Sequence, residues 1–429
     1  MRLRSRQSGP LHGTFAVPGD KSLSHRALIL GALAEGETVI AGLLESADVL
    51  ATAAALRAFG VRVEQFGPGR WRVIGGPWRV PDRPIDCGNS GTSARLLIGA
   101  AAGQGVRATF TGDASLSRRP MRRVRAPLEA MGIEFEGGDT LPLTVQGPPT
   151  RGIVHRNVPA SAQVKSAILL AGLGSDLPIS IEEPVPSRDH SEIMLREFGA
   201  SVEQAGSTIR LGSERRLTGR LVRVAGDPSS AAFALAAAAI VPGSEVTAAL
   251  MLLNPQRSGF VMALQRMGAD VALANVEGQN GETVGDVRVR FGPLFGAEFT
   301  SEEIPSMVDE IPILAVVAAA ARGETRIEGL DELRHKESDR LALMVEGLTA
   351  CGVDARADGD ALVIQGGAAR GGAAVRTDGD HRIAMAHLVL GLAAANPVTV
   401  AEAEMIGTSF PTFREAMRGI GAKIEEVPE

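Results

Sequence analysis

Apolar and polar positions follow one pattern that recurs six times along the chain. Each copy has a polar or glycine-rich turn, an Ala/Leu-rich helix, a short β-branched strand, an amphipathic helix, a glycine and a second short strand. The glycines that follow the amphipathic helices are Gly60, Gly132, Gly199, Gly268, Gly352 and Gly421. Glycine at the end of a helix favours the left-handed conformation. The pattern predicts an α/β protein made of six related βαβ-type subdomains.

The length of the chain predicts more than one domain. With 429 residues it is too long for one ordinary hydrophobic core, so we expect two domains of three copies each. We place the boundary before the fourth copy, which makes residues 18–227 the N-terminal domain and residues 228–429 the body of the C-terminal domain. The widest spacing between the recurring glycines indicates an insertion, and we expect its polar, glycine-rich stretch at 275–285 to be a loop.

The Ala/Leu-rich helices begin at residues that cap helices and carry charge. The expected starts lie at 20–22, 88–93, 159–165, 226–230, 306–310 and 378–382. A helix N-terminus presents unpaired N–H groups and a partial positive charge, so it suits a bound anion. The cations at helix starts are Lys21, Arg26, Arg119, Arg188, Lys336, Arg340 and Arg382. In a protein of net charge −6, they predict substrates with several negative charges.

Acidic residues close to these cations are candidates for proton transfer. Asp309, Glu310 and Glu337 lie in the same charged stretches. A carboxylate beside cations stays ionised and can act as a base, whereas Lys21 or Glu337 could supply the proton.

Composition and motifs exclude several other classes of protein. The net negative charge argues against general nucleic-acid binding, and no apolar run reaches the roughly 18 residues of a membrane span. Cys87 and Cys351 form no CxxC pair, and the seven histidines show no metal-ligand spacing. Neither GxGxxG nor the phosphate-binding loop GxxxxGK[ST] is complete. We therefore predict a cytoplasmic protein without a disulfide, and the motifs support neither a metal site nor a nucleotide cofactor.

Eight motifs in order identify the chain as similar to the 5-enolpyruvylshikimate-3-phosphate synthase family (3-phosphoshikimate 1-carboxyvinyltransferases). The motifs are PGDKSLSHRAL at 18–28, GNSGTSARLL at 88–97, RRPM at 118–121, ASAQVKSAILLAG at 160–172, GDPSSAAFALAAAAI at 226–240, VDEIPILA at 308–315, HKESDRL at 335–341 and DHRIAMA at 380–386. The resemblance implies a two-domain inside-out α/β barrel of six βαβαββ repeats, three per domain, with substrates in the interdomain cleft. It also implies that residues 1–17 join the C-terminal domain.

The resemblance implies a reaction as well. The 5-hydroxyl of shikimate 3-phosphate adds to C2 of phosphoenolpyruvate, and phosphate then leaves the tetrahedral intermediate, on the shikimate pathway to chorismate and the aromatic amino acids. The two substrates carry two carboxylates and two phosphates between them, which matches the cations at the helix starts. The implied enzyme is a cytoplasmic monomer that acts on these small molecules, without a nucleic-acid or membrane partner and without a cofactor.

The family's functional residues carry over onto matching positions of this chain. By similarity, shikimate 3-phosphate is bound by Lys21, Ser22, Arg26, Ser161, Ala162 (through its backbone N–H), Gln163, Arg188, Asp309 and Lys336. Phosphoenolpyruvate is bound by Lys21, Gly91, Arg119, Gln163, Arg340 and Arg382. Asp309 is the implied base at the 5-hydroxyl, and Glu337 or Lys21 is implied to protonate the methylene carbon.

The chain departs from the family pattern at two places. Thr408-Ser409 stand before Phe410-Pro411, where some members carry a lysine, and Ser161-Ala162 stand where many members have two serines.

Two alternatives fit fewer residues. The sister family of UDP-N-acetylglucosamine enolpyruvyl transferases usually carries a cysteine in the loop that corresponds to residues 111–118, and this loop has none. A non-catalytic phosphate-binding scaffold of the same shape would lack the acids and Lys21.

Overall fold

The computed structural model describes residues 1–428, which form two compact units. The N-terminal unit comprises Gly19–Ala225 together with Gln279–Glu282. The C-terminal unit comprises Met1–Pro18, Gly226–Gly278 and the chain from Thr283 onward. Within the described residues no helix has the length and apolar character that a membrane span requires. Cys87 and Cys351 are both buried and free.

The N-terminal unit contains three four-stranded sheets, ordered β14-β3-β5-β4, β6-β7-β9-β8 and β10-β11-β13-β12. The strands are β3 (Glu37–Ala41), β4 (Arg62–Gly67), β5 (Arg70–Ile74), β6 (Ile85–Asp86), β7 (Ala108–Thr111), β8 (Glu134–Gly137), β9 (Leu143–Gln146), β10 (Ile153–Arg156), β11 (Ile179–Glu182), β12 (Val202–Ala205), β13 (Thr208–Leu211) and β14 (Leu221–Arg223). The helices are α1 (Lys21–Leu33), α2 (Ala47–Ala58), α3 (Gly91–Gly103), the 3₁₀ turn η1 (Leu116–Arg118), α4 (Arg122–Ala130), α5 (Ala162–Gly172) and α6 (His190–Glu197).

The C-terminal unit repeats this arrangement, with sheets ordered β22-β23-β1-β24, β16-β17-β15-β2 and β18-β19-β21-β20. The strands are β1 (Arg2–Ser5), β2 (His12–Phe15), β15 (Glu245–Leu252), β16 (Asp270–Gln279), β17 (Glu282–Arg290), β18 (Glu298–Phe299), β19 (Glu324–Ile327), β20 (Asp354–Asp358), β21 (Ala361–Gln365), β22 (Ala374–Val375), β23 (Val398–Val400) and β24 (Ile424–Val427). The helices are α7 (Pro228–Ile240), α8 (Gly259–Arg266), η2 (Ile304–Ser306), α9 (Ile311–Ala320), η3 (Asp331–His335), α10 (Arg340–Ala350), α11 (His381–Ala393), η4 (Ala403–Thr408) and α12 (Phe413–Gly419).

The six sheets share one plan, which confirms the six predicted copies. In β10-β11-β13-β12, for example, the first pair is parallel and the next two are antiparallel. All six recurring glycines have positive φ, between 79° and 107°. The predicted α/β class and its sixfold repetition are therefore confirmed.

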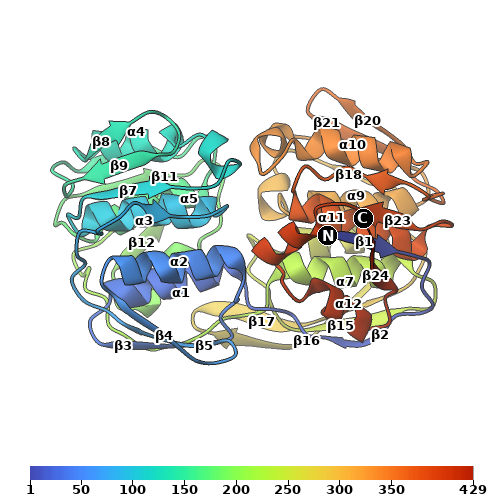
Figure 1. Ribbon diagram of the computed structural model, residues 1–429, viewed down its shortest axis with the longest axis horizontal. Coiled ribbons are helices and arrows are strands. Elements are labelled where there is room, and N and C mark those ends of the chain that lie inside the picture. The colour runs from blue at the N-terminus through green and yellow to red at the C-terminus, as the bar shows by residue number, and fades with distance from the viewer. Residues whose placement is uncertain (429) are drawn as a thin grey trace. The chain divides into compact units, whose positions relative to one another are not determined.

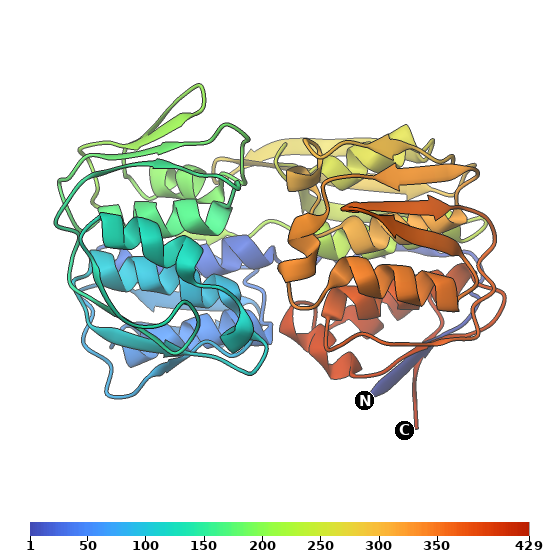
Figure 2. The ribbon, with the colours of Figure 1, turned by 90° about the horizontal axis from the view of Figure 1, so that it is seen from above.

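The Ala-rich helices form the interior of each unit. Every residue of α7 is buried, and α9 and α11 are buried over nearly their whole length. A helix that is apolar all round belongs inside a core. Figure 1 shows α7, α9 and α11 together inside the C-terminal unit, and Figure 2 shows strands of this unit at its periphery. In the N-terminal unit, α3 and α5 approach so closely that a Cβ on Gly99 would lie 2.3 Å from the backbone oxygen of Ala167.

The stretch at 275–285 is a hairpin, so its prediction as a loop is wrong. Strands β16 and β17 run through it and are joined by a turn at Asn280-Gly281, where φ is 49° and 76°. Asn-Gly with both residues at positive φ is the signature of a tight hairpin turn, and this signal outweighs the polar composition. The tip at 279–282 belongs to the N-terminal unit, where the side chains of Gln279 and Asn280 donate to the Arg223 oxygen at 3.2 and 3.3 Å.

Two strands near the N-terminus, β1 and β2, belong to sheets whose other strands come much later in the chain. Strand β1 pairs antiparallel with both β23 and β24, and β2 pairs parallel with β15. Residues Pro18, Gly226 and Asp227, which we assigned to the N-terminal domain, fall in the C-terminal unit. The reason is local, because the Gly226 N–H donates to the Leu250 oxygen and Asp227 caps α7.

Candidate functional site

Five of the six Ala-rich helices begin with a side-chain cap, at starts that the sequence predicts. Asp20, Ser90 and Ser161 accept hydrogen bonds from backbone N–H groups in the first turns of α1, α3 and α5. Asp227 and Asp380 do the same for α7 and α11. Helix α9 differs, because its N-cap residue, Glu310, makes no side-chain cap bond.

The starts of α3 and α5 meet in the N-terminal unit. Gln163 accepts a 2.7 Å hydrogen bond from Arg95 NH1 and donates at 2.9 Å to Thr92 Oγ1. Gly91 opens α3 beside this pair, where a Cβ would lie 2.8 Å from Arg95 NH1 and 3.5 Å from Arg119 NH1. The absent side chain of Gly91 therefore leaves space next to two guanidinium groups.

Arg119 is held at the edge of this space. Its side chain is buried, and its NH2 donates to Asn89 Oδ1 at 2.8 Å and to Ser115 Oγ at 3.3 Å. Two arginines that follow it in α4 face carboxylates: Arg122 lies 3.3 Å from Asp139, and Arg125 lies 2.8 Å from Glu129. Arg119 therefore lies beside Gly91, whereas Arg122 and Arg125 form ordinary ion pairs from α4.

Two predicted cations of α1 already have protein partners. Lys21 forms an ion pair with Asp48 in the first turn of α2. Arg26 is buried and donates to Ser191 Oγ at 2.8 Å, Ser166 Oγ at 2.9 Å and the Ser22 oxygen at 3.1 Å. Burial lowers the pKa of Arg26 to about 10, against the opposing charges of nearby carboxylates. Arg26 thus joins α1, α5 and α6, and the charge of Arg188 reaches it from the turn before α6.

A buried arginine organises the charged residues of the C-terminal unit. Arg340, at the start of α10, is 1% exposed and donates to Asp380 at 2.8 Å and to Glu337 at 2.5 Å. Its NH1 lies 3.5 Å from Asp309 Oδ1. Burial alone would lower the pKa of Arg340, but the three carboxylates raise it above its usual value. Burial likewise opposes ionisation of Asp380, yet Arg340 holds the pKa of Asp380 below its ordinary value.

Asp309 lies between two guanidinium groups. Besides Arg340, Arg382 approaches it, with Nε 3.8 Å from Asp309 Oδ1 and NH1 donating to the Asp309 backbone oxygen at 3.0 Å. The Asp309 side chain keeps 19% of its surface exposed, so a ligand could reach it. The structure therefore brings together Asp309, Glu337, Arg340 and Arg382.

A second layer of polar groups lies at the start of α7. Arg257 donates to Asp227 at 3.1 Å and to Ser229 Oγ at 2.9 Å, and Ser229 in turn donates to the buried Glu310. Burial raises the pKa of Asp227, but the charges of Arg257 and Arg382 bring it below its ordinary value.

Lys336 lies outside this cluster of contacts. It follows η3 and donates at 3.2 Å to Glu332. Lys336 lies in the non-helical segment between η3, which ends at His335, and α10, which begins at Arg340. At Thr408, one of the two departures from the family pattern, Oγ1 donates to the Met405 oxygen at 2.7 Å and lies 3.4 Å from His381 Nδ1, next to the start of α11.

Two other features were considered as binding sites. Among residues 1–428, Asp189, His190 and Glu282 place potential metal ligands within 4.8 Å of one another. His190 Nδ1 is hydrogen-bonded to Glu282 at 2.7 Å, and the negative charge of Glu282 also interacts favourably with the positive charge of Arg26. A metal cation would compete with both, so we assign the group to packing of the hairpin tip against α6.

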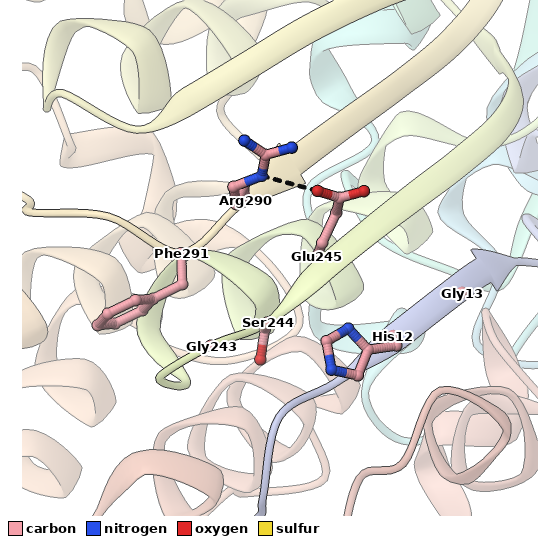
Figure 3. Close-up of a pocket in the computed structure, with 7 residues that line it drawn as sticks. All are labelled: His12, Gly13, Gly243, Ser244, Glu245, Arg290 and Phe291. Atoms are coloured by element: carbon pink, nitrogen blue, oxygen red, sulfur yellow. Dashed lines mark hydrogen bonds and ion pairs between the residues drawn. The ribbon is translucent and has the colours of Figure 1, made fainter.

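The second feature is a hollow of about 470 Å³ at the β2–β15–β17 sheet (Figure 3). It is lined by His12, Gly13, Gly243, Ser244, Glu245, Arg290 and Phe291. Arg290 is paired with Glu245 at 2.7 Å. None of the predicted site residues lines it.

Sequence reasoning missed several residues that hold the predicted ones in place. These are Asp48, Arg95 and Arg257, and also Asp380 in its role as the ion-pair partner of Arg340, since the sequence indicates Asp380 only at a helix start. Arg95 could have been found, because it stands one helical turn after Gly91 and so shares its face. Asp48 and Arg257 come from other parts of the chain, and no local pattern connects them with Lys21 or Asp227.

Comparison with known proteins gives one consistent family. The model of the family described as EPSP synthase (3-phosphoshikimate 1-carboxyvinyltransferase) matches residues 5–417. Proteins named 3-phosphoshikimate 1-carboxyvinyltransferase are 54% identical in Phenylobacterium zucineum, over 98% of this chain and 95% of theirs, and 52% identical in Caulobacter vibrioides, over 99% of both. An EPSP synthase structure from Acinetobacter baumannii is similar with a TM-score of 0.88 and 39% identity, over 99% of both chains. The enolpyruvyl transferase NikO from Streptomyces tendae, at 19% identity and a TM-score of 0.79 over 99% of this chain and 98% of its own, shares the fold.

Proposed function

We propose that this chain, which belongs to the EPSP synthase (3-phosphoshikimate 1-carboxyvinyltransferase) family, transfers the enolpyruvyl group of phosphoenolpyruvate to the 5-hydroxyl of shikimate 3-phosphate. The observation that carries the proposal is the cluster of Asp309, Glu337, Arg340 and Arg382. It combines acids that can move protons with cations that can hold an anionic substrate.

Asp309 is the base in this proposal. Two guanidinium groups within 4 Å favour its charged form, so it can accept the proton of the 5-hydroxyl. As the hydroxyl oxygen bonds to C2 of phosphoenolpyruvate, Glu337 or Lys21 gives a proton to the methylene carbon. In the second half, the C2–phosphate oxygen bond breaks, a proton leaves the new methyl group, and the enol double bond is restored. Phosphate is the product that leaves, and no cofactor takes part.

The substrate ligands are proposed from the helix starts and the basic residues around them. Phosphoenolpyruvate is held by Lys21, Gly91, Arg119, Gln163, Arg340 and Arg382. Shikimate 3-phosphate is held by Lys21, Ser22, Arg26, Ser161, Ala162, Gln163, Arg188, Asp309 and Lys336. The N-termini of α1, α3 and α5 support these roles, because the side-chain cap of each helix bonds only one backbone N–H, and the other N–H groups and the helix dipole favour phosphate and carboxylate oxygens.

Arg26 can bind substrate only by changing hydrogen bonds that it already makes. Its guanidinium donates to three groups of the protein, so a substrate oxygen would have to share or replace one of them. We further propose that the protein works as a cytoplasmic monomer on these small molecules, in the shikimate pathway that leads to chorismate and the aromatic amino acids.

The test is a phosphate-release assay with phosphoenolpyruvate and one of two acceptors, shikimate 3-phosphate or UDP-N-acetylglucosamine. Release with shikimate 3-phosphate alone is the expected result. Release with the nucleotide sugar alone would refute the proposed substrate and favour the sister activity. Product mass should equal the acceptor plus the enolpyruvyl group, which excludes simple hydrolysis of phosphoenolpyruvate.

A further inference from the structure

A lysine lies buried between two glutamates in the N-terminal unit. The Lys165 side chain is 1% exposed, and its Nζ lies 2.6 Å from Glu183 Oε2 and 2.7 Å from Glu192 Oε1. Both glutamate side chains are buried as well, at 5% and 1% exposed. Burying charges is costly unless they are paired at close range, and removing one member of such a group leaves the others without a partner. The proposed reaction uses none of these three residues.

The two glutamates stand on either side of the turn that carries Arg188. Glu183 follows β11 and Glu192 lies in the first turn of α6, so Lys165 ties both ends of segment 183–192 to α5. Lys165 also donates to the Ser187 backbone oxygen at 3.3 Å, and Ser187 Oγ donates to Glu183 Oε1 at 2.6 Å. Ser187 immediately precedes Arg188, so this cluster fixes the backbone from which the Arg188 side chain starts.

The same cluster reaches Arg26 through two serines. Ser166 follows Lys165 in α5 and Ser191 precedes Glu192 in α6, and their hydroxyls lie 2.6 Å apart. Both hydroxyls accept hydrogen bonds from Arg26. A shift of α6 against α5 would therefore disturb the two serine acceptors of Arg26 and the turn of Arg188 together.

We propose that Lys165 is a positioning residue for shikimate 3-phosphate, which it serves by fixing Arg188 and Arg26 without touching either substrate. This inference rests on the proposed function, because both arginines are assigned to that substrate there. The proposal predicts that a change in this cluster affects the two substrates differently. No partner of Lys165 is a proposed phosphoenolpyruvate ligand, so disturbing the cluster should weaken the use of one substrate and spare the other.

The first experiment replaces Lys165→Met and measures KM for each substrate together with kcat. We expect KM for shikimate 3-phosphate to rise by about tenfold or more, because a small misplacement of a binding group has effects of this size or larger. KM for phosphoenolpyruvate should stay within about twofold. Lys423→Met, at an exposed lysine of the C-terminal unit, is the matched control and should change neither value. An unchanged KM for shikimate 3-phosphate, or an equal rise for both substrates, would overturn the proposal.

A second pair of variants keeps the test decisive, because Lys165→Met leaves two buried carboxylates unpaired and could prevent folding. Ser187→Ala removes the 2.6 Å hydrogen bond to Glu183 and leaves the charged triplet in place. We expect a rise of about threefold in KM for shikimate 3-phosphate alone. Ser175→Ala, which removes a serine–backbone bond at the far end of α5, should leave KM unchanged. If Ser187→Ala matches its control, the proposal is wrong.

Failure of the proposed function is distinguishable from failure of this inference. If the unaltered protein releases no phosphate from the two substrates, the proposed function fails and the inference falls with it. If the unaltered protein is active and the variants lack the selective change, the inference alone fails.

Discussion

Arg340 donates a 2.8 Å hydrogen bond from Nε to Asp380 Oδ2, with both side chains excluded from solvent. Asp380 is also the residue that caps α11, where Arg382 begins its approach to Asp309. Arg340, a proposed ligand of phosphoenolpyruvate, is therefore also bonded to the residue that caps α11. Stability and activity should depend on Arg340 together.

Replacing Arg340→Met should destabilise the fold as well as abolish activity. The change leaves Asp380 buried without its cation, and breaking a buried ion pair from one side costs about 3–5 kcal/mol. Urea unfolding measures the loss. Arg356→Met, which removes an exposed arginine 3.6 Å from Glu324, should change the free energy of unfolding by less than about 1 kcal/mol. Equal effects of the two substitutions would show that the buried pairing contributes little.

Replacing Asp309→Asn should remove the proposed base while keeping its shape. We expect kcat to fall by about 10²–10⁴-fold, the usual contribution of a positioned general base. Steady-state kinetics with both substrates checks this. Asp331→Asn, at an exposed aspartate of η3, serves as the control and should retain full activity. A kcat of Asp309→Asn within about threefold of the unaltered value would remove Asp309 from proton transfer.

Replacing Gly91→Ala should impair the use of phosphoenolpyruvate. The added Cβ would lie 2.8 Å from Arg95 NH1 and 3.5 Å from Arg119 NH1, so at least one guanidinium must move. We expect KM for phosphoenolpyruvate to rise by about tenfold. Gly138→Ala in the same unit is a suitable control, because no atom lies within 4 Å of the added carbon. An unchanged KM for Gly91→Ala would contradict the assignment of Gly91 to this subsite.

Stability should fall as the pH drops below neutrality. Burial lowers the pKa of His387 to about 4, whereas an unfolded histidine titrates near 6.5. Between these values the unfolded chain binds a proton that the folded chain does not, so acid favours unfolding. The contribution of His387 to the free energy of unfolding is fully present above about pH 6.5. At pH 5 this contribution has fallen by roughly 2 kcal/mol. Burial also lowers the pKa of His25, which adds to the same trend.

Unfolding by urea at pH 7 and pH 5 measures this loss, and His387→Leu should reduce the difference between the two values. His335→Leu, at an exposed histidine, should leave the difference unchanged. If His387→Leu keeps the full pH dependence, the buried imidazole is not its source. Gly347 is part of this environment, because a Cβ there would lie only 2.2 Å from His387 Nε2.

Local patterns in the sequence predicted the repeated elements well. The six glycines, the caps at Asp20 and Asp380 and the buried Ala-rich helices all depend on neighbours within a few residues, so their signals are visible in the sequence. The error at 275–285 was also local, since composition was given more weight than the Asn280-Gly281 turn.

The arrangement of the charged groups could not be predicted in the same way. Asp309 meets Arg340 and Arg382 from elements that lie far apart in the chain, and Lys165 meets Glu183 and Glu192 across α5, β11 and α6. Such contacts depend on how elements pack. The sequence indicated the cations at the helix starts together with Asp309 and Glu337, whereas the structure shows which charges pair and adds Asp48 and Asp380 as partners.

Strand β1 has a consequence for how the protein is made. Its two partners, β23 and β24, lie about 400 residues later in the chain, and a ribosome that adds roughly 5–20 residues per second needs about 20–80 s to reach them. The whole segment of the N-terminal unit from Gly19 to Ala225 emerges in the meantime and can fold first. During translation the first strand is an unpaired edge that other chains could capture. The sheet β22-β23-β1-β24, against which α11 packs, can therefore be completed only at the end of synthesis.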